Sequence, residues 1–127
     1  MNEPRWVTLP QAIRIHAEQL ANFGGPAGIR DEGMLESALD RPRNKFHHGQ
    51  ESLAALAAAY AFGIAKNHPF IDGNKRAAFA VMMVFLLKNK VEFVPDQGDA
   101  TRIILELAAG ALTEDELTAW IRANIAA

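Results

Sequence analysis

The sequence predicts an all-α fold, a helical bundle built around a central apolar helix. Apolar residues recur at spacings of three and four along nearly the whole chain, which is the helical period. The segment from Ala77 to Leu87 is an uninterrupted apolar run, too short to cross a bilayer and typical of a buried helix. A short extended piece is conceivable over residues 91–94, but no pattern requires a sheet.

Composition limits the classes of function. The 127 residues fit one domain, residues 1–127, and half of them are apolar, so the chain can bury a core. With no cysteine, disulfides and cysteine-based zinc sites are excluded and a reducing compartment is favoured. The N-terminus lacks a signal-peptide pattern, and we expect a cytoplasmic protein. A net charge of −2 argues against a nucleic-acid backbone as the main partner.

The N-terminal third predicts two helices. Thr8 and Gln11 have the spacing of a capping box, and the helix that they open should stop at Gly24. Asp31 is expected to cap a short second helix that ends at Arg41 and Pro42, since proline disfavours helix at the residue before it. Residues 41–50 are then expected to form a loop.

The middle of the chain predicts two long helices separated by a chemically rich loop. Residues 51–67 are rich in alanine, the strongest helix former, and their small side chains allow neighbouring helices to approach closely. Residues 68–74 contain helix breakers. The helix expected over residues 75–89 is apolar on almost every side, so we expect it to be the hub of the core.

The C-terminal third predicts a loop and two shorter helices. Residues 90–97 should form the loop, with Val91, Phe93 and Val94 held against the core. Asp99 is expected to cap the next helix, and Thr113 with Glu116 forms a second capping box that opens the last one.

The segment from His68 to Arg76, which reads HPFIDGNKR, has the composition of an anion site. It leads directly into the apolar helix, whose first N–H groups lack internal partners and carry the positive end of the helix dipole. Gly73 leaves room for a phosphate to approach, and Lys75 and Arg76 add positive charge.

Two further residues of this segment suggest phosphoryl-type transfer. Asp72 would be misplaced beside phosphates unless a cation lay between them, and Mg²⁺ is commonly held by a carboxylate together with phosphate oxygens. His68 carries an imidazole, the side-chain type in this segment that is best suited to proton transfer near neutral pH. Phosphoryl-type transfer needs a base, a metal ligand, free backbone N–H groups and positive charge, and this segment contains all four.

Each of these residues has a plainer interpretation. A histidine is often structural, an aspartate before a helix is often its cap, and two cations in a first turn are often simply solvated. Cations at a helix N-terminus oppose the dipole, however, which favours a compensating anion. Lys66 lies two residues before His68 and is a candidate for the same site, whereas His16 is expected to be structural. His47 and His48 lack a third ligand and are weak evidence for a metal.

The motif His-Pro-Phe-x-Asp-Gly-Asn followed by Lys-Arg resembles the signature of the Fic/Doc family, and specifically its Doc (death-on-curing) toxin branch. Residues 28–42 also resemble the family's N-terminal half. The resemblance implies a Fic-like helical bundle in which His68 is the general base, Asp72 binds Mg²⁺, and Asn74, Lys75 and Arg76 contact the phosphates of ATP. It also places residues 41–50 near the flap where a target protein docks.

Two departures from the wider Fic pattern bear on the reaction. Most Fic enzymes have glycine where this chain has Lys75 and a second arginine where it has Phe79, and enzymes with both features typically transfer AMP. Doc-like members share the lysine and lack that arginine, and for them the resemblance implies a kinase that transfers the γ-phosphate. A nucleotidyl (AMP) transferase on a protein hydroxyl remains the alternative, and a catalytically silent protein-binding module is a third interpretation.

The resemblance also implies partners. The family's self-inhibitory pattern, a serine or threonine followed four residues later by glutamate, is absent from the chain. A Phd-like antitoxin is therefore expected, whose disordered C-terminal segment folds onto this protein. The target implied for the Doc branch is elongation factor Tu, modified on a threonine or serine hydroxyl with inhibition of translation. No direct contact with nucleic acid or membrane is expected.

Overall fold

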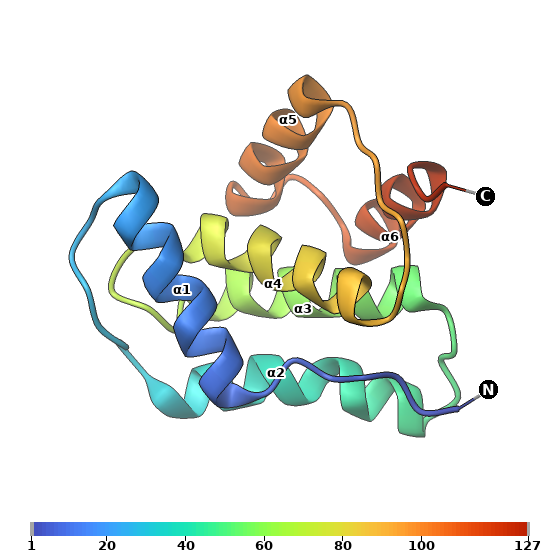
Figure 1. The fold of residues 1–127 in the computed structure, drawn as a ribbon, viewed down its shortest axis with the longest axis horizontal. Helices are drawn as coiled ribbons and strands as arrows, with labels where there is room; N and C mark the ends of the chain where they lie inside the picture. The colour runs from blue at the N-terminus through green and yellow to red at the C-terminus, as the bar shows by residue number, and fades with distance from the viewer. Residues whose placement is uncertain (1, 127) are drawn as a thin grey trace.

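The computed structural model describes residues 2–126, and across these residues the regular secondary structure is entirely helical (Figure 1). This confirms the predicted all-α class. Residues 1 and 127 of the expected single domain lie outside the described part. No helix in the described range is long and apolar enough to cross a membrane. The helices are α1 (Leu9–Phe23), α2 (Glu32–His47), α3 (Leu53–Asn67), α4 (Asn74–Lys88), α5 (Gln97–Ala108) and α6 (Glu114–Ala123).

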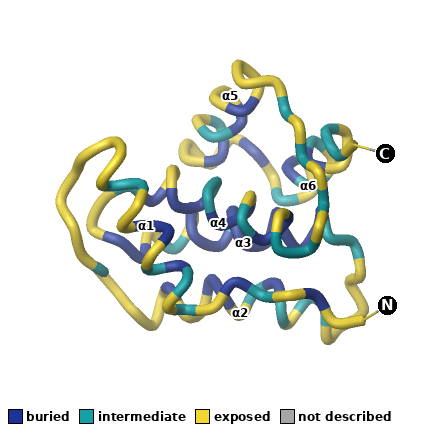
Figure 2. Tube along the Cα trace, in the orientation of Figure 1, coloured by how far each residue is buried: buried dark blue, intermediate teal, exposed yellow. Residues whose placement is uncertain are grey.

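The alanine-rich helix α3 is the most buried element (Figure 2). It packs against α2, α4, α5 and α6, and every residue from Ala54 to Ala61 is buried. The expected hub, α4, contributes fully buried Val81, Met82 and Phe85 but leaves Leu87 exposed to solvent. The central position is therefore shared by two helices. The small side chains of α3 permit close neighbours on all sides, which is why it can lie deepest.

Among the predicted N-terminal caps, one is wrong. Both capping boxes, at Thr8 and at Thr113, are present. Helix α5 begins three residues earlier than the sequence predicted, because Asp96 is its cap and accepts a hydrogen bond from the Asp99 N–H at 3.0 Å. The prediction that Asp99 caps α5 is therefore wrong, since an aspartate one turn earlier offers the same bond.

The prediction that α2 ends at Pro42, with a loop over residues 41–50, is also wrong. Helix α2 continues through Pro42 to His47. Pro42 is buried, so packing offsets its missing backbone hydrogen bond. The residues on both sides of it are also held: Arg41 and Lys45 both pair with Glu114 of α6, and Phe46 meets the Trp6 ring edge-on. Tertiary contacts override the local signal.

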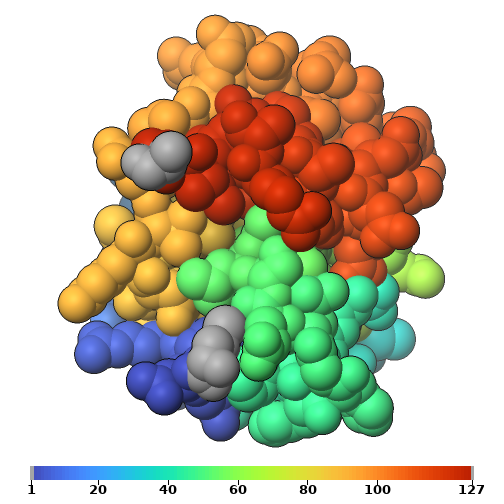
Figure 3. Space-filling model, turned by 90° about the vertical axis from the view of Figure 1, so that its right-hand side faces the viewer, coloured from blue at the N-terminus to red at the C-terminus, as the bar shows by residue number. Residues whose placement is uncertain are grey.

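The C-terminal part covers α3 and α4 on the side away from α2 (Figure 1). Phe79 of α4, Phe93 of the loop between α4 and α5, and Trp120 of α6 form an aromatic cluster, with 5.4 Å between the Phe93 and Trp120 rings. Figure 3 shows the C-terminal helix lying over the end of α2 and the start of α3, where Arg122 donates to the Ser52 hydroxyl at 3.0 Å. As expected, Val91 and Phe93 pack against the core, but the same expectation is wrong for Val94, whose side chain is exposed.

Candidate active site

The loop between α3 and α4, residues 68–73, is paired with the segment just before α2. The backbone N–H groups of Arg30 and Asp31 both donate to the Pro69 carbonyl, at 2.7 and 3.0 Å. The Ile71 N–H donates to the Gly28 carbonyl at 3.1 Å. A single antiparallel bridge between Ile29 and Phe70 results. The loop that carries the candidate chemistry is therefore fixed from outside its own sequence.

The side chain of Arg30 holds the backbone of the candidate base. Its Nε donates to the His68 carbonyl at 2.7 Å and its terminal nitrogen to the Asn67 carbonyl at 2.8 Å. His68 is the C-cap of α3 and has left-handed backbone angles, φ 47° and ψ 56°, which non-glycine residues rarely adopt. Arg30 therefore donates hydrogen bonds to carbonyls that have no partner at the end of the helix, and these bonds stabilise the turn.

Asn74 also acts within the loop. Its side-chain oxygen accepts from the Phe70 N–H and its amide nitrogen donates to the Phe70 carbonyl, both at 2.9 Å. The residue is buried. One N–H of the amide and its oxygen are thus used within the loop, so the Asn74 side chain holds the loop closed while its backbone N–H remains free for a ligand.

His16 supports the loop from α1, as the expected structural role requires. Its ring is buried and stacks on Phe70 with 3.7 Å between ring centres. Its Nε2 lies 2.7 Å from the Asp72 carbonyl. This contact fixes the backbone of Asp72 and leaves the carboxylate to reach solvent.

The N-terminus of α4 is open. Within residues 2–126 every other helix has a side chain that caps its first turn, whereas α4 begins at Gly73 with no side-chain cap. Gly73 has φ 76°, and a Cβ there would lie 3.4 Å from Leu20 and 3.5 Å from His16. The N–H groups of the first turn, from Asn74 to Arg76, therefore face outward without an intrahelical partner.

A cavity of about 400 Å³, which we call the α4 cavity, lies in front of this helix end. It brings together all the predicted site residues except Lys66. Lys75 and Arg76 are exposed, and the Arg76 guanidinium lies 4.8 Å from the centre of the Phe23 ring. The lining residues are His68, Ile71, Asp72, Gly73, Asn74, Lys75, Arg76 and Ala108.

The carboxylate of Asp72 lies against Gly25, the residue that follows the end of α1. A Cβ on Gly25 would approach the Asp72 Oδ2 to 2.6 Å, so only glycine leaves the carboxylate in place. The described residues contain no cluster of three or more groups able to hold a metal on their own. One exposed carboxylate beside an anion site fits Mg²⁺ that takes its other ligands from phosphate and water.

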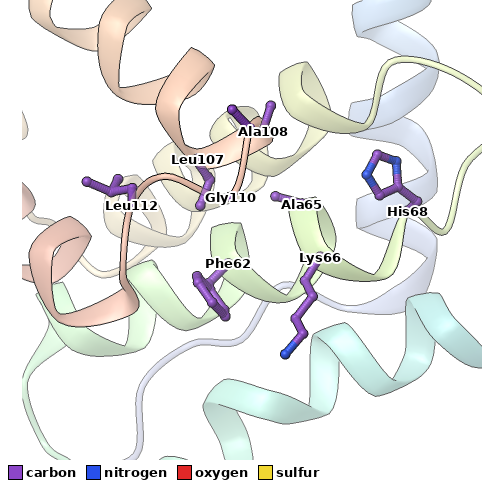
Figure 4. Close-up of a pocket in the computed structure, with 9 residues that line it drawn as sticks. Phe62, Ala65, Lys66, His68, Leu107, Ala108, Gly110 and Leu112 are labelled. Carbon is purple, nitrogen blue, oxygen red and sulfur yellow. The ribbon is translucent and has the colours of Figure 1, made fainter.

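A second hollow of about 360 Å³, the α5 hollow, opens on the other side of His68 (Figure 4). It lies between the end of α3 and the turn from α5 to α6, and it shares His68 and Ala108 with the α4 cavity. Figure 4 shows Lys66 extending from α3 toward α2, away from the His68 ring. Lys66 therefore lines the α5 hollow together with His68 but does not line the α4 cavity, where the other predicted site residues meet.

Sequence analysis assigned no role to Arg30 or Gly25. Both lie far along the chain from the loop that they support: Arg30 is 38 residues before His68. The hydrogen bonds of the Arg30 side chain, at 2.7 and 2.8 Å, form only once the chain has folded. The one available signal was Gly28-Ile29-Arg30-Asp31 in the part that resembles the family.

Comparison with known proteins agrees with this geometry. The family model described as "Fic/DOC family" matches residues 6–86. Over 77 residues the chain is 39% identical to "Toxin Doc" of Mycolicibacterium smegmatis, and the match covers 58% of each protein. Over 119 residues it is 25% identical to "Protein kinase doc" of Escherichia phage P1, covering 93% of this chain and 94% of the phage protein. The matched family region includes the whole loop and most of α4.

Proposed function

Because this chain belongs to the Fic/DOC family, we propose that it is a Doc-type toxin that transfers the γ-phosphate of ATP to a threonine or serine hydroxyl of a protein. The observation that carries the proposal is the uncapped start of α4, where Lys75 and Arg76 face the same cavity as His68 and Asp72. Five helices with side-chain caps and one without indicate that an external anion takes the place of the missing cap.

The residues of the α4 cavity divide into three roles. The free N–H groups behind Gly73, with Lys75 and Arg76, bind phosphate oxygens. Asp72 holds Mg²⁺, which supplies charge neutralisation to the phosphates when it is bound. The Asn74 side chain contributes by keeping the loop closed on Phe70.

His68 takes the proton of the acceptor hydroxyl. The hydroxyl oxygen forms a bond to the γ-phosphorus while the bond from that phosphorus to the β–γ bridging oxygen breaks, and ADP leaves. His68 borders both the α4 cavity and the α5 hollow, so the acceptor can enter from the hollow while the nucleotide occupies the cavity. The side-chain contacts of Arg30 keep the imidazole at this boundary.

Phe79 favours phosphate transfer over AMP transfer. At this position, where AMP-transferring relatives are expected to have a second arginine, the ring packs with Phe93 and Trp120. An apolar side chain within a cluster cannot hold a phosphate, so the cations available to the nucleotide lie at the first turn of α4, at Lys75 and Arg76.

The proposed target is elongation factor Tu, with inhibition of translation as the consequence, and a Phd-like antitoxin is the proposed partner that controls the activity. The relative named "Toxin Doc" supports a place in a toxin–antitoxin system. Co-purification of this protein with the product of the neighbouring gene tests the antitoxin proposal. Cells that survive expression of this protein without that product would contradict it.

Labelled ATP tests the reaction directly. Purified protein is incubated with Mg²⁺, elongation factor Tu and ATP that carries the label in either the γ- or the α-phosphate. We expect label on the factor from the γ position alone, and a loss of about 10²–10⁴-fold in the His68→Ala variant. Transfer from the α position instead establishes the nucleotidyl transferase. Growth inhibition that survives His68→Ala unchanged establishes the silent binding module.

A further inference from the structure

A third hollow, distinct from the α4 cavity, lies between the second half of α2 and the end of α3. We call it the α2–α3 groove. Its volume is about 350 Å³, and its polar lining comprises Ser37, Arg41, Asn44, Lys45, Lys66 and Asn67. Apart from the backbone contacts of Ala38 and Gly63, the lining is made of polar and positively charged groups. Such a surface suits a polar ligand.

Positive charge exceeds negative charge in this groove. Arg41 and Lys45 share one carboxylate, Glu114, with 2.7 Å between the Lys45 Nζ and the Glu114 Oε2. Lys66 has no ion pair among the described residues, and its ammonium lies 5.9 Å from the centre of the Phe62 ring. The Arg41 guanidinium lies 5.3 Å from the same ring. Two like charges on one ring repel each other unless an anion lies between them.

The groove also retains hydrogen-bonding capacity. The Nε of Arg41 is buried and lacks a hydrogen-bond partner. Such a buried donor is costly unless a ligand satisfies it. Asn67 also lines the groove, and its amide nitrogen donates to the Met34 carbonyl at 3.0 Å. Glu114 already shows that a carboxylate fits between Arg41 and Lys45.

The groove connects to the site through Lys66 and His68. Lys66 borders both the groove and the α5 hollow, and His68 borders both the α5 hollow and the α4 cavity. A chain bound along this path would pass from the cations of the groove to the candidate base. The phosphates of the nucleotide would lie beyond His68, in the α4 cavity, so the groove is left for the other substrate.

We propose that the α2–α3 groove docks an acidic segment of the protein substrate, next to the hydroxyl that is modified. That the docked segment leads to the modified hydroxyl rests on the proposed function. The binding of an acidic segment to the groove does not depend on it. Aspartate and glutamate side chains suit the groove better than a nucleic-acid backbone does, because the chain as a whole has a net charge of −2 and would repel a long polyanion.

Binding is tested with a fluorescein-labelled hexaglutamate peptide in a fluorescence anisotropy titration at low salt. We expect saturable binding that weakens about tenfold in the double variant Lys45→Gln/Lys66→Gln and is unchanged in His68→Ala. The matched control is Arg14→Gln/Lys90→Gln, which also removes two positive charges, from exposed positions outside the groove. Absence of binding, or an equal loss in this control, overturns the proposal.

Two competitors separate the other possible occupants. Millimolar inorganic phosphate that displaces the peptide would identify a phosphate site, and an oligonucleotide of equal charge that binds more tightly than the peptide would identify a nucleic-acid surface. Either result overturns the proposal. We expect neither competitor, nor ATP with Mg²⁺, to displace the peptide.

Kinetics then tests whether the groove serves the substrate. In Lys66→Gln we expect the KM for the protein substrate to rise about five- to tenfold and to become less sensitive to salt, with kcat and the KM for ATP unchanged. A fall in kcat alone overturns the docking role. If the unaltered protein transfers no phosphate to any target, the proposed function fails, while the anisotropy titration still decides whether the groove binds acidic peptide.

Discussion

Arg30 is the residue on which the backbone position of His68 depends most directly. Its guanidinium bonds to the carbonyls of Asn67 and His68 and so stabilises a left-handed turn at a non-glycine residue. Arg30→Ala removes both bonds, and we expect kcat for phosphate transfer to fall about 10- to 100-fold, since misplacing a catalytic group slows the reaction. The KM for ATP should stay nearly constant, because the start of α4 is untouched.

Arg30→Lys distinguishes positioning from general support of the fold. One ammonium can restore one of the two bonds, so kcat should recover in part. The measurement is steady-state kinetics together with the NMR shifts of the His68 ring. An unchanged kcat in Arg30→Ala, with a lower melting temperature, would leave Arg30 with a purely structural role.

Gly25 determines whether the Asp72 carboxylate can occupy its observed place. With φ 118°, an alanine here is strained, and its Cβ would lie 2.6 Å from the Asp72 Oδ2. Gly24 provides a matched control, because it also has a positive φ, 81°, but a Cβ there would meet nothing within 4 Å. Both variants should lose about 1–2 kcal/mol of stability to backbone strain.

Only Gly25→Ala should also affect Mg²⁺. We expect its affinity for ATP to fall about tenfold when Mg²⁺ is present and to change little when it is absent, because the displaced group is the proposed metal ligand. Calorimetric titration of both variants, with and without Mg²⁺, measures this. Equal losses in Gly24→Ala and Gly25→Ala would remove Asp72 from the metal site.

At the scale of elements, α2 and α3 approach each other at a glycine. A Cβ on Gly63 would lie 3.3 Å from both the Cα and the Cβ of Ala38 and 3.4 Å from its carbonyl oxygen. Gly63→Ala should destabilise the fold by about 1–3 kcal/mol, because overpacking against a backbone outweighs the gain in helix propensity. Gly33→Ala, at an exposed position in the first turn of α2, should instead stabilise it by about 0.5–1 kcal/mol. Urea denaturation of the two variants should give opposite signs, and equal signs would contradict the close approach.

Helix α6 is joined to α2 through Glu114. Burial raises the pKa of this carboxyl, but hydrogen bonds and charge from Arg41 and Lys45 outweigh burial and hold its pKa below the ordinary value of 4.5. The lowered pKa in the folded state means that the unfolded chain binds the proton more readily. The stabilisation is therefore present above the ordinary pKa of about 4.5 and is lost as the pH falls through the lower folded value.

Glu114→Gln removes this pH dependence. At pH 7 we expect it to cost about 1–3 kcal/mol, less than a fully buried pair, because the side chains of Arg41 and Lys45 are 40% and 39% exposed. The difference from the unaltered protein should shrink between about pH 5 and pH 3. Chemical denaturation over this range tests the prediction, and a difference that is independent of pH would show that Glu114 acts by packing alone.

At the scale of the whole molecule, local patterns predicted what depends on local sequence. The capping boxes at Thr8 and Thr113, the helical class and the loop that precedes α4 are properties of short segments, and the structure confirms them. The failures have tertiary causes. Helix α2 passes through Pro42 because α6 and the N-terminal segment hold its second half. Likewise, the structure alone reveals how Arg30 supports His68 and that Lys66 points toward α2.

At the start of α4, the residues that bind the ligand should lower the stability of the free protein, and the melting temperature of the whole protein should show this. Lys75 and Arg76 oppose the helix dipole, so in the absence of ligand the double variant Lys75→Gln/Arg76→Gln should gain about 0.3–1 kcal/mol per charge, or about 2–7 °C in Tm for the two charges together. With ATP and Mg²⁺ at about 100 times Kd, the unaltered protein should gain about 2.7 kcal/mol, or roughly 10 °C, and the double variant almost nothing.

A control, Arg14→Gln/Lys90→Gln, removes the same charge from exposed positions outside the cavity and should retain the full shift. The two melting curves should therefore change order when ligand is added, because the cations that destabilise the free protein are the ones that bind the anion. A double variant that is less stable without ligand and still shifts by several degrees with it would show that α4 needs no anion.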